Sequence, residues 1–69
     1  MSYNYGELLG KIKARRMTQR ELADAIGVNK ATLNLKLNGK GSFTTEEIDS
    51  ICRVLDIPNN KIGDYFFAN

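Results

Sequence analysis

Histidine is absent from the 69 residues and cysteine occurs once, so the side chains that most often bind metals or transfer protons are missing. A single cysteine forms no internal disulfide, and without histidine it leaves no plausible zinc site. Cys52 falls on an apolar helical stripe, which indicates a core residue rather than a reactive thiol. The chain also lacks a phosphate-cradling glycine loop and a nucleophile paired with a base. We therefore expect no enzymatic activity, no cofactor, no metal and no small-molecule substrate.

Long apolar runs are absent as well. No stretch approaches the roughly 20 residues that a membrane helix needs, and no basic-then-apolar leader opens the chain. We therefore expect a soluble protein without a membrane partner. The length fits one domain over residues 1–69, with a core small enough to gain from a partner subunit.

The most informative pattern that is present covers residues 17–40. Thr18 and Glu21 have the spacing of a capping box, in which each side chain bonds the other's backbone N–H. A helix is therefore predicted from Thr18 to Ile26. Gly27 follows as its stop, because glycine readily adopts the left-handed backbone of a sharp helix exit.

A second helix is predicted directly after this turn. Asn29 is placed to cap it, and the helix runs from Lys30 to about Asn38 and ends at Gly39. Two short helices joined by a tight turn are typical of a helix-turn-helix. The inner apolar positions of the pair are Leu22, Ala23, Ile26, Leu33 and Leu37.

Three more helices complete an all-α prediction, since no alternating strand pattern competes. Capping-box spacing marks the start of two of them, at Asn4 with Glu7 and at Thr44 with Glu47. Pro58 suits the first turn of the last. The five expected helices cover about residues 5–16, 18–26, 30–38, 44–55 and 58–66.

Charge is unevenly distributed although the net charge is only +2. Residues 11–40 hold eight basic and two acidic side chains, a balance of +6, while the rest of the chain holds two basic and six acidic ones, a balance of −4. A segregated basic face attracts phosphate even when the total charge is small. The alternative is a solvated surface on which the charges cluster by chance.

Two sets of segments carry a family resemblance. Residues 18–28 (TQRELADAIGV), followed by 38–40 (NGK), resemble the helix-turn-helix of the Cro/CI-like (Xre-type) phage repressor family. Residues 5–12, 32–40 and 64–67 are similar to a narrower group of small phage-encoded members. The resemblance implies a compact five-helix lambda-repressor-like domain that controls transcription in the cytoplasm of a bacterial host, at the nucleoid. Such domains commonly bind a two-fold operator as dimers.

Candidate base contacts follow from the helix over 30–38. At about 100° per residue, Leu35 points away from the inner leucines. The resemblance implies that the first positions of this helix and those near its middle face the DNA groove. Lys30 would then donate to guanine, Asn34 would pair with adenine, and Ala31 or Leu35 would contact a thymine methyl group. For Leu35, coverage by a partner chain and simple exposure remain as alternatives.

Candidate phosphate contacts lie near the helix ends, where they set register rather than sequence preference. Gln19 resembles the phosphate-clamping glutamine of the family. Lys36 stands where the broader family carries an aliphatic residue, so we expect Leu37 to take over packing and Lys36 to be free for phosphate. Arg15, Arg16 and Arg20 are weaker candidates. The full set is Thr18, Gln19, Thr32, Lys36, Asn38 and Lys40.

The aromatic tail of Tyr65, Phe66 and Phe67 is the candidate for contacts other than DNA. Three consecutive aromatic residues do not all face inward on one short helix, so at least one is expected at the surface. The tail is read either as a homodimer contact, formed in solution or only on DNA, or as closing the monomer core.

Sequence alone therefore predicts a DNA-binding transcriptional regulator, a phage or prophage repressor whose partners are operator DNA and a second copy of itself. The alternative is a helix-turn-helix module that acts mainly through a protein partner, as an antitoxin or as a modulator of another repressor.

Overall fold

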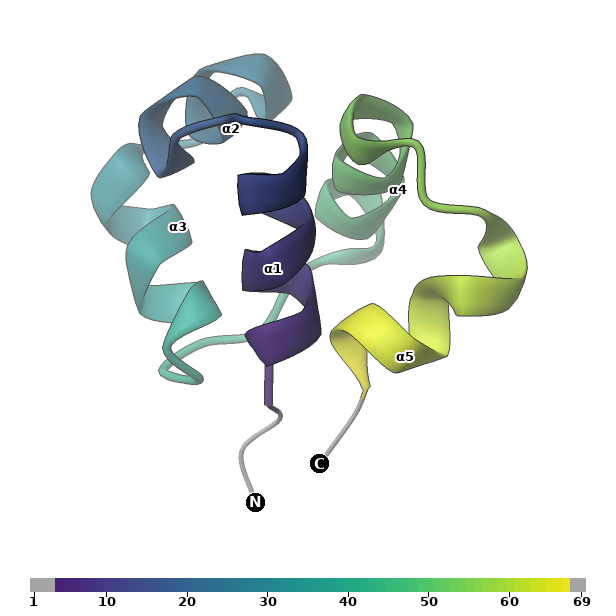
Figure 1. The fold of residues 1–69 in the computed structure, drawn as a ribbon. Coiled ribbons are helices and arrows are strands. Elements are labelled where there is room, and N and C mark those ends of the chain that lie inside the picture. Colours follow the sequence, from purple (N-terminus) through teal and green to yellow (C-terminus); the bar gives the residue numbers. More distant parts are fainter. Residues whose placement is uncertain (1–3, 68–69) are drawn as a thin grey trace.

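The computed structural model describes residues 4–67, which form five α-helices and one short 3-10 turn, with no strand among them. The elements are α1 (Gly6–Ala14), α2 (Gln19–Ile26), α3 (Lys30–Leu37), α4 (Thr45–Leu55), η1 (Asn59–Lys61) and α5 (Ile62–Phe66). In Figure 1, α1 stands between the α2–α3 pair on one side and α4 with α5 on the other. The predicted all-α, five-helix class is confirmed.

Side-chain caps begin three of the helices as the sequence predicts. Thr18 and Glu21 form the capping box of α2, and Thr44 and Glu47 form that of α4. At the start of α3, the Asn29 side chain accepts a hydrogen bond of 2.7 Å from the backbone N–H of Ala31. These caps satisfy N–H groups that have no partner inside a helix.

The first helix begins differently from the prediction. It starts at Gly6 with Tyr5 at the cap position; Tyr5 makes no side-chain cap, and its ring is buried in the core. Asn4 Oδ1 instead accepts a bond of 2.8 Å from the Gly6 N–H, in a local turn. The predicted capping box of Asn4 with Glu7 is therefore wrong.

Left-handed residues end the first four helices: Arg16, Gly27, Gly39 and Asp56. The two glycines are the predicted stops. Arg16 has a φ of 56° and ends α1 at Ala14, two residues earlier than expected. The Met17 N–H then bonds the Ile12 carbonyl at 3.1 Å, as in other helix endings of this kind.

Pro58 precedes the last helical segment without entering it. It stands before the 3-10 turn of residues 59–61, and α5 starts only at Ile62. The predicted fifth helix thus exists, but its first turn is 3-10.

One hydrophobic core holds the helices together. Cys52 is buried in it, as predicted, and burial together with the charge of nearby Asp49 raises the pKa of its thiol. None of the described helices is long and apolar enough to cross a bilayer. Within residues 4–67, no three potential metal-binding acidic, histidine or cysteine side chains come together. The core residues are Tyr5, Leu8, Ile12, Leu22, Ala23, Leu33, Leu37, Ile51, Cys52, Leu55, Ile57 and Phe66.

Candidate functional site

The outward side of α3 presents the four predicted base-contacting residues, Lys30, Ala31, Asn34 and Leu35, and all four are exposed. Leu33 and Leu37, on the opposite side of the helix, are 1% and 4% exposed and anchor it to the core. The outward position that helical periodicity predicts for these residues is therefore observed, while their contact with DNA stays a prediction. Leu35 stands out because half of its surface (51%) remains accessible.

A shallow surface hollow lies where the starts of α2 and α3 approach each other. It is lined by Thr18, Gln19, Arg20, Lys30, Ala31 and Asn34. The starts of both helices contribute backbone N–H groups and positive dipole ends, and two of the lining side chains are cations. This combination favours an anionic group.

Hydrogen-bonded amide side chains link the two helices along this hollow. Asn34 Nδ2 donates to Gln19 Oε1 at 3.0 Å, and Asn38 Nδ2 donates to Asn34 Oδ1 at 3.2 Å and to the Asn34 carbonyl at 2.9 Å. A predicted base contact and two predicted phosphate contacts therefore bond one another. Sequence reasoning missed this network, because Gln19 and Asn34 are 15 residues apart.

The prediction that Lys36 is free to bind phosphate is wrong. Leu37 packs in the core as expected, but the Lys36 ammonium lies 2.7 Å from Glu47 Oε1 and 2.8 Å from Oε2. The two side chains are only 17% and 16% exposed. The carboxylate thus takes the place that was assigned to phosphate, and Lys36 joins α3 to α4.

The environment of Glu47 shifts its acidity. Burial raises the pKa of its carboxyl, but hydrogen bonds from Lys36 and Thr44 and the positive charge of Lys36 outweigh that effect. The pKa of Glu47 therefore lies below its ordinary value. Glu47 is charged at neutral pH and balances the lysine that is packed against it.

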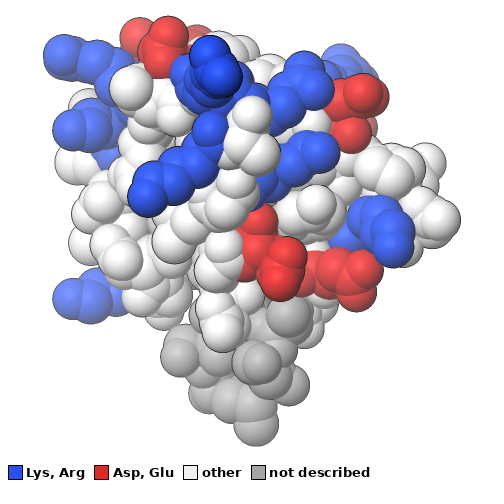
Figure 2. All heavy atoms as spheres, in the orientation of Figure 1, with Lys and Arg blue, Asp and Glu red and all other residues white. Residues whose placement is uncertain are grey.

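The other predicted phosphate contacts remain at the surface. Thr18, Thr32, Asn38 and Lys40 are exposed, and Gln19 is half-buried. Arg15, Arg16 and Arg20 are exposed as well. Figure 2 shows Lys and Arg side chains gathered on the upper part of one face, over α2 and the end of α1.

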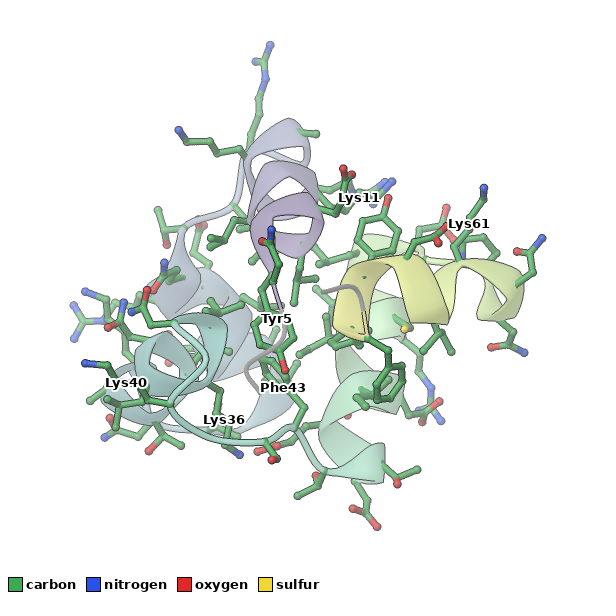
Figure 3. The ribbon with its side chains drawn as sticks, turned by 90° about the horizontal axis from the view of Figure 1, so that it is seen from below. Tyr5, Lys11, Lys36, Lys40, Phe43 and Lys61 are labelled. Carbon is green, nitrogen blue, oxygen red and sulfur yellow. The ribbon has the colours of Figure 1, made fainter. Side chains whose placement is uncertain are left out.

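An aromatic cluster forms a second surface feature. The Phe43 ring stands edge-on between the rings of Tyr5, at 5.3 Å, and Phe66, at 5.5 Å. Figure 3 shows Tyr5 and Phe43 next to each other. These rings border a hollow, here called the aromatic hollow, lined by Tyr5, Ser42, Phe43, Ile48, Phe66 and Phe67.

The three aromatic residues of the tail have different positions. Phe66 is 1% exposed and closes the core, which removes it from the candidate dimer contacts. Tyr65 packs partly against the core, and Phe67 is 51% exposed. The prediction that at least one of the three lies at the surface is confirmed. Of the two readings of the tail, the structure supports core closure for Phe66, while the Phe67 ring lies at the surface.

Comparison with known proteins places the chain in a family. The model of the DUF739 family, described as a protein of unknown function, matches residues 1–69, so the chain belongs to that family. A search of curated proteins found no match.

A solved structure is similar over nearly the whole chain. It is the solution structure of the modulator of repression (MOR) of the temperate bacteriophage TP901-1 from Lactococcus lactis. The two are 42% identical, with a TM-score of 0.79, and the match covers 97% of this chain and 90% of the other. The expected resemblance to small phage proteins is thereby supported. Membership of the Cro/CI-like family is not confirmed.

Proposed function

We propose that this protein modulates the action of a phage repressor by binding that repressor, and that it acts by binding alone, without catalysis. The observation that carries the proposal is the 42% identity over 97% of the chain to a phage modulator of repression. This similarity favours the protein-partner alternative over direct operator binding, which was the main prediction from the sequence.

The aromatic hollow is the surface that best suits a protein partner. Phe67 is one of only two large apolar side chains among residues 4–67 that are largely exposed, and it borders a cluster of rings. Aromatic side chains are enriched at the centres of protein interfaces, where burial releases the most free energy. We propose that an apolar side chain of the repressor enters this hollow.

Binding can be measured with the repressor of the phage or prophage that carries this gene. The tagged protein should retain that repressor on a column, and calorimetry should give the affinity. Phe67→Ala should weaken binding about tenfold or more, because truncation of a buried aromatic contact removes a large share of interface energy.

Leu35→Ala provides a matched control, because Leu35 is exposed to the same fraction, 51%, but lies on α3. It should leave the affinity nearly unchanged. Loss of binding with Leu35→Ala and not with Phe67→Ala would show that the repressor binds the outward face of α3 instead of the aromatic hollow. A wild-type protein that does not bind the repressor would overturn the proposal.

Operator binding is the second candidate, favoured by the anion-suited hollow between α2 and α3. In this reading Lys30, Ala31, Asn34 and Leu35 face the major groove, and a homodimer places two copies on half-sites about one helical turn apart. Selection of binding sites from random DNA with the purified protein tests it. A palindromic motif would support this candidate, whereas a featureless pool and no gel shift at low salt would exclude it.

A further inference from the structure

The side chain of Lys36 follows an enclosed path from α3 to α4. Its stem passes closely beneath the loop of residues 38–44, since a Cβ placed on Gly41 would lie 3.3 Å from Lys36 Cγ. Its ammonium ends on both carboxylate oxygens of Glu47. Figure 3 shows Lys36 beside this loop.

Glu47 also holds the backbone of Thr44, the residue that follows Phe43. Its Oε1 atom also accepts a hydrogen bond of 2.8 Å from the backbone N–H of Thr44, and Thr44 Oγ1 accepts one of 3.1 Å from the Glu47 N–H. One carboxylate thus binds Lys36 and holds the backbone next to Phe43. The Phe43 ring in turn lies between Tyr5 and Phe66 at the aromatic hollow.

Beyond the hydrogen bonds that the Gly39 and Lys40 N–H groups make to the last turn of α3, the loop has few contacts of its own, so it needs such a constraint. Gly39 and Gly41 have no side chains to pack, and Lys40 and Ser42 are exposed. Glycine also carries the largest loss of backbone entropy on ordering. Phe43 is the first residue after α3's end that packs against the core.

We propose that Lys36 is a positioning residue for partner binding: through Glu47 and Thr44 it fixes the loop and sets the Phe43 ring in the aromatic hollow. The inference rests on the proposed function of that hollow. It assigns Lys36 a role at the protein interface without direct contact with the partner.

Lys36→Met tests the proposal, because methionine keeps an apolar stem beneath Gly41 and removes the ammonium. NMR spectra of the free protein should show displaced ring signals for Tyr5, Phe43 and Phe66. Amide hydrogen exchange of Lys40 and Thr44, whose N–H groups bond Leu35 and Glu47 at the two ends of the loop, should be about tenfold faster, as expected when a charge-assisted hydrogen bond is lost. Affinity for the repressor should fall by a similar factor.

Two further variants make the result specific. Lys61→Met removes the same charge from an exposed lysine that Figure 3 shows far from Lys36, and it should leave ring signals, exchange and affinity unchanged. Glu47→Gln keeps an N3 side chain able to cap α4 but loses the charge, so it should reproduce the effect if Lys36→Met fails to fold.

Unchanged ring signals and exchange in Lys36→Met and Glu47→Gln would overturn the inference. So would a lower affinity without any change at Phe43, since Lys36 would then touch the partner itself. The spectra need no repressor, so a wild-type protein that fails to bind would count against the proposed function alone.

Discussion

Thr18 and Glu21 each hydrogen-bond the backbone of the other: the Thr18 N–H donates to Glu21 Oε1 at 2.8 Å, and the Glu21 N–H donates to Thr18 Oγ1 at 3.0 Å. The pair fixes the start of α2, and with it one wall of the hollow between α2 and α3. The Thr18 hydroxyl therefore stabilises the start of this helix.

Thr18→Ala should lower the free energy of unfolding by about 1 kcal/mol, because the Glu21 N–H loses its acceptor. Urea denaturation followed by circular dichroism measures the loss. Thr18→Ser keeps the hydroxyl and should lose much less. Equal losses in the two variants would show that the threonine methyl group, and not the cap, stabilises the helix.

Local signals of this kind explain why the helices were predictable. A cap and a left-handed glycine act over three or four residues, so Thr18, Thr44 and Gly27 specify helix ends without tertiary information. The error at Asn4 concerns which N–H group its side chain binds: it bonds the Gly6 N–H instead of that of Glu7, and α1 starts one residue later than predicted.

The surface features were harder to predict, because they depend on contacts between residues that are distant in sequence. Exposure of Asn34 followed from helical periodicity, but its bond to Gln19 did not, because it depends on how α2 and α3 pack. The prediction that Lys36 is free for phosphate is wrong for the same reason. Its partner Glu47 is 11 residues away and becomes its neighbour only through the path of the loop after α3.

Gly10→Ala should stabilise the protein. Gly10 lies inside α1, and a Cβ at this position meets no atom within 4 Å. Alanine at a helix interior is favoured over glycine by about 0.8–1 kcal/mol, which thermal denaturation would show as a higher midpoint. Gly27→Ala is the control of opposite sign. Gly27 has a φ of 76°, so alanine there should cost about 1–2 kcal/mol.

Arg16→Gly should also stabilise the fold. Arg16 has a φ of 56°, a left-handed conformation that costs a residue with a side chain about 1–2 kcal/mol. Glycine removes that cost but loses about 0.5–1 kcal/mol of backbone entropy, so a net gain of up to about 1.5 kcal/mol is expected.

Arg15→Gly is the matched control for this change. Arg15 has a φ of −85°, so glycine brings no conformational relief there and should destabilise the protein. Chemical denaturation of both variants measures the change in the free energy of unfolding. A loss of stability in both would mean that the Arg16 side chain contributes more than its backbone conformation costs.

Glu47 should make stability depend on pH in the acidic range. Its pKa in the folded protein lies below the ordinary value of 4.5, so folding is favoured while the carboxylate is charged. This contribution is fully present above the ordinary value and is lost as the pH falls through the lowered pKa. Urea denaturation at a series of values from about pH 6 to about pH 2 measures it.

Glu47→Gln isolates the charge in this experiment, because glutamine can still cap α4 and accept a bond from Lys36. The wild type should be more stable than this variant near neutral pH, and the difference should shrink as the solution is acidified. Glu46→Gln, at the exposed neighbouring position, controls for a general loss of negative charge. A difference that stayed constant or grew toward low pH would show that the charged pair does not stabilise the junction of α3 and α4. Lys36 and Glu47 would then join the two helices by packing and by hydrogen bonds that do not depend on the charge of the carboxylate.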